Sequence, residues 1–455
     1  MSRSRRFPVL VVVAAVLAAT AVAVTLTHPK NPSGSPSGLS VTINTESSAL
    51  YCTGLSNGPG AAGRVDFYNT ANGPRNLNVS VVSSQDTTWS GSLELGAHQG
   101  QFIQPSVLDK STKNATYGVA VQISGGGVVG EEIEGGDRAE APCVNQGATR
   151  WYATGFDTLV GSSADLSVYN PTATAAVLNA SIYSATGVSE PQSFQGISVP
   201  AHTQSTIDLG TEVVNTQNVG VEVHVLRGSL EIVGVQDSNG SISLDPGQRQ
   251  ASAAAWLPDV TTVQNATAQL RLANPSDRLA NVTVSVALGQ FKIPPQRVTL
   301  SPFSTGSITI TPNPAIPASG YASLTVRSSV PILTTLATGS GSVVLLSSPS
   351  APVGEVFVRD FTALGFDAAT VTNTSARAVR LTLSTFNSAS PKTVTVSGRI
   401  TLRGGATTNL SSLFSTFTAA GDAFLLSSSS PTIVVSLTLP SRPRGVDVVS
   451  PLNGR

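Results

Sequence analysis

The sequence has 455 residues with 26 basic and 26 acidic side chains, and charged residues make up only 11% of it. Soluble globular chains usually contain about 25% charged residues, so Ser, Thr, Asn and Gln must supply most of the solvated surface. A neutral chain without basic runs in its body lacks the electrostatic footprint of a nucleic-acid-binding protein, and we expect no nucleic-acid partner. The length corresponds to about three or four domains.

The amino terminus has the pattern of an export segment. Arg3, Arg5 and Arg6 precede an uncharged stretch, residues 7–27, dominated by Val, Ala and Leu. Its length of about 20 residues is enough to cross a bilayer as one helix, and the positive charge should stay on the cytoplasmic side. Residues 1–28 are therefore expected to be either an uncleaved signal anchor or a signal peptide cleaved near Ala21-Val22-Ala23. Residues 29–45 are a Pro/Ser/Gly-rich linker, and all that follows should be extracytoplasmic.

Only two cysteines are present, Cys52 and Cys143. In an oxidising compartment an even pair predicts a disulfide. Two unpaired buried thiols are the alternative.

The sequence repeats four times, and the clearest landmark is a strand that ends in Asn. The asparagines are spaced 101, 104 and 99 residues apart, at Asn69, Asn170, Asn274 and Asn373. Pro or Thr follows each one, and Asn can bond its own chain two residues further on, so a turn is expected there. An alternating stretch rich in β-branched residues comes next, such as 282–286, which is typical of a half-buried strand.

A second landmark has nearly the same period. Glycines precede the last long strand region of each repeat at spacings of 102, 100 and 101 residues, at Gly118, Gly220, Gly320 and Gly421. Each repeat also opens on an aromatic residue, at Tyr51, Trp151-Tyr152, Trp256 and Phe357. With about 103 residues and six or seven short strands per repeat, the period is too long for a solenoid unit and fits a self-contained sandwich.

The predicted fold class is all-β, with four tandem immunoglobulin- or fibronectin-like β-sandwich domains after an N-terminal hydrophobic helix. The expected boundaries are 46–145, 146–248, 249–350 and 351–455, and these ranges are named repeats 1 to 4 below. Segments rich in small residues, 136–147, 245–252 and 347–354, are expected to act as linkers.

From Cys143 through Gly147, Arg150-Trp151-Tyr152 and Gly155 to Tyr169-Asn170-Pro171, the chain resembles an actinobacterial family of secreted proteins described only as a domain of unknown function. The resemblance covers about residues 46–450. Repeat 1 departs from it with Thr70 in place of Pro, and repeat 4 lacks the opening Trp. The resemblance implies no activity and no catalytic residue.

Polar residues that could carry chemistry are few. His98 and His202 occupy one equivalent turn, where repeats 3 and 4 have Phe303 and Gly404, and a turn role is expected for both. The acidic cluster Glu131, Glu132, Glu134 and Asp137 is expected to be a solvated strand edge, with a calcium site or a catalytic carboxylate pair as alternatives. No cysteine has a zinc-ligand spacing, so no metal and no cofactor are expected.

These observations favour a non-enzymatic extracytoplasmic protein of the cell envelope with a structural, adhesive or scaffolding role. Its partner would be an envelope protein or a wall polymer, and residues 7–27 would contact the membrane. A carbohydrate- or wall-polymer-binding module is the alternative, with Trp89, in an expected polar loop, as the candidate glycan contact. An enzyme with an interdomain site is the remote alternative.

Overall fold

A computed structural model describes the chain in segments separated by gaps. The described residues are 40–41, 48–56, 63–84, 87–109, 116–134, 139–261, 267–288, 291–310, 321–340, 343–347, 355–359, 369–386, 395–409, 423–438 and 448–449. The predicted signal or anchor helix, 1–28, and nearly all of the linker, 29–45, lie outside them. Among the described residues, regular structure is almost entirely β-strand, with a four-residue helix α2 (Pro105–Leu108) and two 3-10 turns, η1 (Gln192–Phe194) and η2 (Leu209–Thr211).

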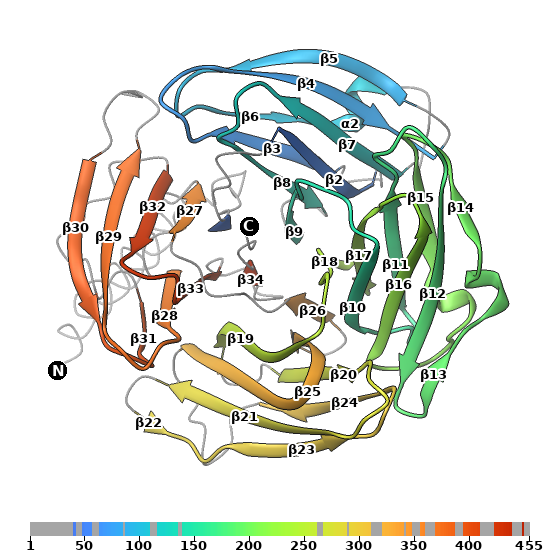
Figure 1. The fold of residues 1–455 in the computed structure, drawn as a ribbon, viewed down its shortest axis with the longest axis vertical. Helices are drawn as coiled ribbons and strands as arrows, with labels where there is room; N and C mark the ends of the chain where they lie inside the picture. Colours follow the sequence, from blue (N-terminus) through green and yellow to red (C-terminus); the bar gives the residue numbers. More distant parts are fainter. Residues whose placement is uncertain are drawn as a thin grey trace, which may run out of the picture. The chain divides into compact units, whose positions relative to one another are not determined.

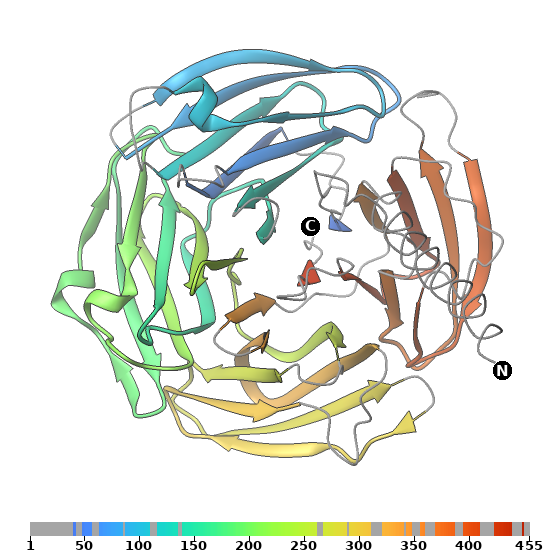
Figure 2. The same cartoon turned by 180° about the vertical axis from the view of Figure 1, so that it is seen from behind.

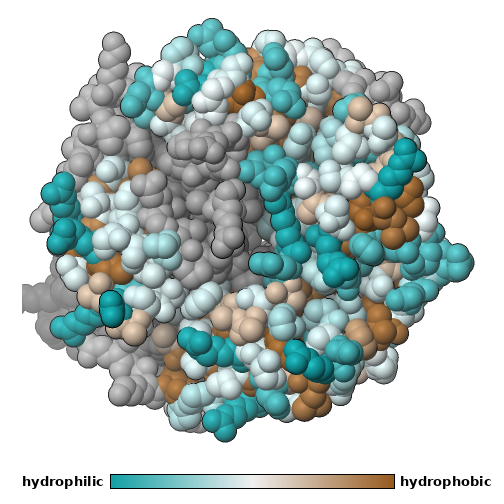
Figure 3. Space-filling view, viewed as in Figure 1, coloured by the Kyte–Doolittle hydropathy of each residue, from teal (hydrophilic) through white to brown (hydrophobic). Residues whose placement is uncertain are grey.

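The strands follow from alternating side chains. In β4 (Arg75–Val82), Leu77, Val79 and Val81 are buried, whereas Asn78 is exposed. Successive side chains of a strand point to opposite faces, so this alternation gives one apolar face for the core and one polar face for solvent. The face of the molecule in Figure 3 shows apolar patches interspersed with polar residues.

Repeat 1 contains two four-stranded sheets (Figure 1). The first has the order β2 (Ala49–Ser56), β7 (Thr116–Ile123), β4, β5 (Thr87–Leu95). The second has the order β6 (Gly100–Ile103), β3 (Arg64–Asn69), β8 (Val128–Glu134), β9 (Ala139–Pro142). One apolar core takes residues from both sheets, among them Leu50, Phe67 and Tyr117.

Repeat 2 has the same plan. One sheet has the order β15 (Gln204–Asp208), β11 (Ser162–Tyr169), β17 (Glu231–Ser238), β18 (Ser241–Asp245). The facing strands are β10 (Arg150–Phe156), β16 (Val219–Arg227) and β12 (Ala176–Ser184), with β13 (Gly187–Ser189) and β14 (Ile197–Val199) paired to β12. Their core includes Phe156, Leu166 and Val221.

Repeat 3 is built around the 20-residue strand β25 (Tyr321–Ser340). The first part of β25 pairs with β19 (Ser252–Thr261) and β21 (Ala280–Leu288), and its later part pairs with β20 (Thr267–Asn274) and β26 (Val343–Ser347). The strands β22 (Phe291–Lys292), β23 (Gln296–Leu300) and β24 (Ser304–Thr309) complete this set. A parallel bridge between Ser184 and Ser304 joins strands of repeats 2 and 3 into one thirteen-stranded sheet.

Repeat 4 contributes all strands of two further sheets except β1 (Ser40–Val41), which comes from the predicted linker and pairs with β27 (Glu355–Arg359). Figure 2 shows these sheets from the opposite side. One has the order β1, β27, β32 (Ala423–Ser428), β29 (Val379–Phe386), β30 (Thr395–Leu402). The other has the order β31 (Thr407–Asn409), β28 (Ala369–Asn373), β33 (Ile433–Thr438), β34 (Val448–Val449). Sheets facing each other across apolar cores are consistent with β-sandwich domains, as the sequence predicts at the level of fold class.

The four landmark asparagines are buried and make the same set of hydrogen bonds. Asn170 Nδ2 donates to the carbonyls of Thr174, Val199 and Pro200 at 2.8–3.0 Å, and its Oδ1 accepts the Thr172 N–H at 2.9 Å. Asn69, Asn274 and Asn373 repeat this pattern with the corresponding carbonyls and with the N–H two residues further on. The amide therefore ties the turn after its own strand to a second loop 26 to 30 residues away.

That second loop contains a left-handed residue in every repeat. His98, His202 and Phe303 have φ values of 55°, 54° and 53°, and Gly405 has 69°. The turn role expected for His98 and His202 is confirmed, but the equivalent residue of repeat 4 is Gly405 and not Gly404. His98 Nε2 lies 3.0 Å from Asn72 Oδ1, and burial lowers the pKa of this histidine.

Candidate functional site

The junction between repeats 1 and 2 is a buried network of neutral polar groups. Gln204 Nε2 donates to the Thr53 carbonyl and to Ser167 Oγ, both at 2.7 Å. Thr53 Oγ1 donates in turn to the Ser167 carbonyl at 3.2 Å. Thr53 and Gln204 are fully buried, so each of these bonds forms away from water. Hydrogen bonds between buried polar groups thus join residues more than 100 positions apart in the sequence.

Two of the landmark glycines, Gly118 and Gly220, lie where the backbone of one repeat closely approaches the next repeat. A Cβ placed on Gly118 would lie 2.8 Å from Gln204 Oε1, and one placed on Gly220 would lie 3.2 Å from the Ala273 Cβ. In both cases one of the two nearest atoms belongs to the following repeat, and the other belongs to the same repeat as the glycine. The period of these two glycines therefore reflects packing between neighbouring repeats.

The junction between repeats 2 and 3 contains a buried ion pair. Arg271 Nη2 lies 2.8 Å from Asp157 Oδ2, and Arg271 Nη1 donates to the Gly155 carbonyl. Asp157 Oδ1 also accepts the Asn218 N–H at 3.0 Å. Asn218 Nδ2 crosses the same junction to the Gly306 carbonyl at 2.8 Å. The pair is therefore embedded in further hydrogen bonds, which a buried charge pair needs to offset its desolvation.

Ser167 and Arg271 occupy the same position, three residues before the landmark Asn of their repeats, and both bond to the preceding repeat. Repeat 1 has Asp66 there, which pairs with Arg64 of its own strand at 3.0 Å. Repeats 3 and 4 are linked through Ser323 Oγ and Thr407 Oγ1, 2.8 Å apart. Sequence analysis missed these residues, although a polar residue within each apolar strand was the available signal.

The acidic cluster is not a solvated edge, and that prediction is wrong. Glu131, Glu132 and Glu134 are at most 1% exposed, and every residue of β8 is buried. The second face of this sheet is covered because β9 packs against strands of repeat 2, in an apolar cluster of Ala139, Ala141, Val233 and Leu244. Asp137 lies outside the described residues. The segment 136–147 is also more than a linker, since it contains the buried strand β9.

These carboxyl groups bond to backbone amides of β2. Glu132 Oε2 accepts the Gly54 N–H at 2.7 Å, and Glu134 Oε1 accepts the Ser56 N–H at 3.1 Å. Burial raises the pKa of Glu132 to about 8 and that of Glu134 to about 7. In repeat 2, Gln236 Oε1 accepts the equivalent Asp157 N–H at 2.7 Å. A neutral amide thus makes the bond that Glu134 makes in repeat 1, which fits a structural role for these acids.

Glu231 lies in the same region between repeats 1 and 2. It is fully buried, and burial raises its pKa well above the usual range, while Arg249 opposes this shift and Glu132 adds to it. Tyr51 of repeat 1 and Tyr169 of repeat 2 lie beside it, with ring centroids 5.7 Å apart. The junction therefore holds two buried carboxyl groups, Glu132 and Glu231, whose pKa is raised by burial.

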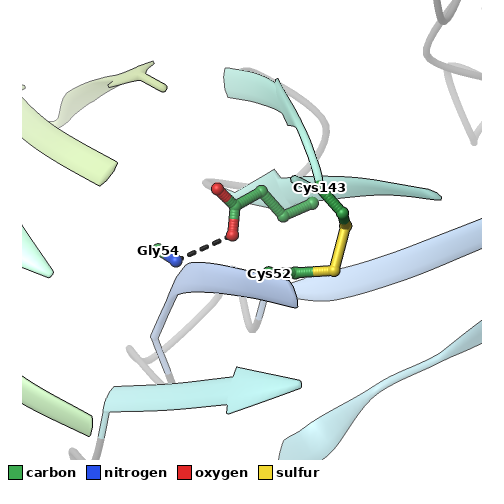
Figure 4. Close-up of a disulfide and its surroundings, with 4 residues drawn as sticks. Cys52, Gly54 and Cys143 are labelled. Atoms are coloured by element: carbon green, nitrogen blue, oxygen red, sulfur yellow. Dashed lines mark hydrogen bonds between the residues drawn. A yellow bond between two sulfur atoms is a disulfide. The ribbon is translucent and has the colours of Figure 1, made fainter. Parts of the chain in front are cut away.

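Cys52 and Cys143 form the predicted disulfide, with 4.6 Å between their Cα atoms (Figure 4). The bond connects β2 to the residue after β9 and lies beside the Gly54–Glu132 hydrogen bond. Paired hydrogen bonds between Tyr51 and Val144, at 2.7 and 2.9 Å, continue this connection. Disulfides persist in oxidising compartments, so this one indicates an extracytoplasmic protein.

Trp89 lies in strand β5 and not in the predicted loop. Its partly buried ring packs against the core of repeat 1 and over Gly91. Its role as a glycan contact stays a prediction. Among the described residues, no group of three or more His, Cys, Asp or Glu side chains could hold a metal ion. No helix in that part of the chain is long and apolar enough to cross a membrane, and residues 7–27 lie outside it.

A shallow pocket of about 300 Å³ opens where repeats 2 and 3 meet. Arg150 and Tyr152 line it from β10, Arg249 and Gln250 from the segment after β18, and Pro275 and Ser276 from the turn after β20. Two cationic side chains from different segments therefore converge on one opening.

A family model described as "Family of unknown function (DUF5719)" matches residues 138–412, which is more than half of the chain. The chain belongs to the DUF5719 family. The matched range includes the Asp157–Arg271 pair and the pocket residues, whereas Cys52 and Trp89 precede it. The resemblance to a family of unknown function is thereby confirmed. No curated protein matches the chain.

Three solved structures that match this DUF5719 chain have low sequence identity and low TM-scores. A Thermotoga maritima protein, 1070, has 16% identity and a TM-score of 0.20, with 22% of this chain and 93% of that chain covered. A mutant of the major pilin of Streptococcus pyogenes has 10% identity and a TM-score of 0.13, covering 67% and 100%. A tetra-tandem repeat from the extending region of a large adhesion protein has 10% identity and a TM-score of 0.10, covering 91% and 97%. With TM-scores this low, none of the three assigns a fold or a function.

Proposed function

We propose that this DUF5719 protein is a non-enzymatic structural component of the cell envelope. The proposal rests on the junctions, where buried hydrogen bonds and the Asp157–Arg271 ion pair hold successive repeats together. Flexibly linked domains would leave these polar groups in water. Fixing them in dry interfaces favours a protein that keeps its repeats in a set relation to one another, as a scaffold requires.

The finer architecture is part of the same proposal. Repeats 1 to 4 act as immunoglobulin- or fibronectin-like sandwiches, and residues 7–27 deliver or anchor the chain at the membrane of an actinobacterial cell. The disulfide in repeat 1 supports residence outside the cytoplasm. Partners would be an envelope protein or a wall polymer that contacts sheet edges and loops.

The test is made in the organism that carries the gene. Cells lacking the protein should show greater envelope permeability to a dye and greater sensitivity to lysozyme. Restoring the full chain should reverse both changes, restoring the junction variant Arg271→Ala should not, and the surface variant Arg297→Ala should act as wild type. Crosslinking in intact cells should capture an envelope protein or wall polymer. An unchanged envelope in the deletion strain would refute the proposal.

A further inference from the structure

The pocket between repeats 2 and 3 has walls fixed by the fold. Tyr152 and Gln248 exchange two backbone hydrogen bonds of 2.7 Å, which hold the segment bearing Arg249 against β10. Gln248 Nε2 also donates to the Thr334 carbonyl of repeat 3 at 3.2 Å. The opposite wall is the turn closed by Asn274, whose Oδ1 accepts the Ser276 N–H at 3.1 Å. The opening therefore exists before any ligand binds.

The two arginines that line the pocket, Arg150 and Arg249, have different partners. Glu222 lies 3.4 Å from Arg150 Nε and balances that cation. Arg249 donates to the neutral Gln146 carbonyl at 2.7 Å, and its guanidinium carbon lies 5.5 Å from the centroid of the Trp151 ring. The carboxyl group that interacts electrostatically with Arg249 is Glu231, which is fully buried and has its pKa raised by burial. Among the described residues, Arg150 has a carboxylate within ion-pair distance and Arg249 has none.

The side chains that line the pocket combine hydrogen-bond donors with apolar surface, as a sugar ring requires. Arg249 and Gln250 are exposed and carry N–H donors, and a guanidinium has five of them in a planar fork that matches carboxylate and phosphate oxygens. Pro275 and the Tyr152 side chain supply apolar surface. The volume of about 300 Å³ is at the lower end of ligand pockets, which favours one sugar-sized unit.

We propose that this pocket binds an anionic sugar unit, with the carboxylate or phosphate of the ligand on Arg249 and Arg150. The site goes beyond the scaffold function and does not depend on it, because the scaffold rests on buried junction residues and the binding on exposed arginines.

The test is calorimetric titration of the purified full chain with glucuronic acid, glucose 1-phosphate and neutral glucose. We expect saturable binding of at least one anionic probe, weakened by added salt, and binding of glucose at least about tenfold weaker. Comparison of the two anions identifies whether a carboxylate or a phosphate is preferred. Arg249→Gln should reduce affinity for the preferred anion about tenfold, because a charge-assisted hydrogen bond is lost.

Controls separate binding from folding. Arg297→Gln, an exposed arginine of β23, should bind as wild type, and thermal unfolding should show that each variant is folded. If Arg249→Gln is unstable, two other variants replace it. Arg150→Gln should bind the preferred anion more weakly than wild type, and Arg249→Lys should retain part of the wild-type affinity. Equal affinity for glucose and the anions, unchanged affinity in the folded arginine-to-glutamine variants, or no binding of any probe would overturn the proposal. None of these results would alter the envelope phenotype that tests the scaffold function.

Discussion

Arg271 and Asp157 form an ion pair of 2.8 Å between two buried side chains that lie 114 residues apart in the sequence. Each belongs to a different repeat, so the pair exists only when repeats 2 and 3 are packed together. The ion pair should therefore contribute to the free energy of unfolding of the whole chain.

Removal of one partner should be strongly destabilising. We expect Arg271→Ala or Asp157→Ala to lower the free energy of unfolding by about 3–5 kcal/mol, because a buried charge is left uncompensated. Urea unfolding measures the loss, with Arg297→Ala as the exposed control. The double variant should lose much less than the sum of the two single variants. Additive losses would show that the two residues do not stabilise each other.

The landmark asparagines lead to a second prediction. Asn170→Asp keeps the size of the side chain but removes the amide N–H donors that bond the carbonyls of Thr174, Val199 and Pro200. The Thr174 and Pro200 carbonyls still accept hydroxyl groups of Thr172 and Thr203. With a cost of about 1–3 kcal/mol for an unsatisfied buried group, we expect a loss of about this size at pH 7. Thermal unfolding provides the measurement, and Asn281→Asp, at an exposed position of β21, is the control. Equal melting temperatures for the two variants would contradict the prediction.

The local features of this fold could be predicted from sequence, and the contacts between repeats could not. The bond from each Asn to the N–H two residues on, and the turn at His98 and His202, depend on residues close in sequence and are confirmed. The burial of Glu132 depends instead on strands of repeat 2, about 100 residues away. A cluster of three glutamates resembles a solvated edge when only its own repeat is considered.

The separation of contacting residues in the sequence also decides which parts of the candidate sites could be predicted. The pairing of Cys52 with Cys143 could be predicted because only two cysteines exist. Arg249 and Arg150 are about 100 residues apart and gave no motif, so the pocket was missed. Trp89 was assigned to a loop by its polar neighbours, whereas alternation in β5 directs its ring onto the core.

Removal of the disulfide should destabilise both repeat 1 and the junction between repeats 1 and 2. Cys52→Ser with Cys143→Ser should lower the free energy of unfolding by about 2–5 kcal/mol, as is usual when a native disulfide is removed. Because the bond lies beside the Gly54–Glu132 contact, hydrogen exchange should also increase at Gly54 and at the Thr53 region. If hydrogen exchange increases only in the core of repeat 1, the disulfide does not stabilise the junction between repeats 1 and 2.

The buried glutamates should make the protein more stable in mild acid than in mild base. Burial raises the pKa of Glu132 to about 8 in the folded chain, whereas the ordinary glutamate value is 4.5. Between these values the folded state keeps a proton that the unfolded state releases, so the free energy of unfolding falls as pH rises from about 4.5 to about 8. The expected slope is up to about 1.4 kcal/mol per pH unit for each such group.

Glutamine variants test this cause directly, because glutamine copies the protonated acid. Glu132→Gln and Glu134→Gln should each flatten the decline and stabilise the chain at pH 8, as the natural Gln236 bond in repeat 2 suggests. Glu94→Gln, at an exposed position of β5, should leave the pH profile unchanged. Urea unfolding at a series of pH values from 4 to 9 gives the comparison. A wild-type profile that rises toward pH 8, or glutamine variants with the wild-type slope, would show that these carboxyl groups are ionised in the folded chain.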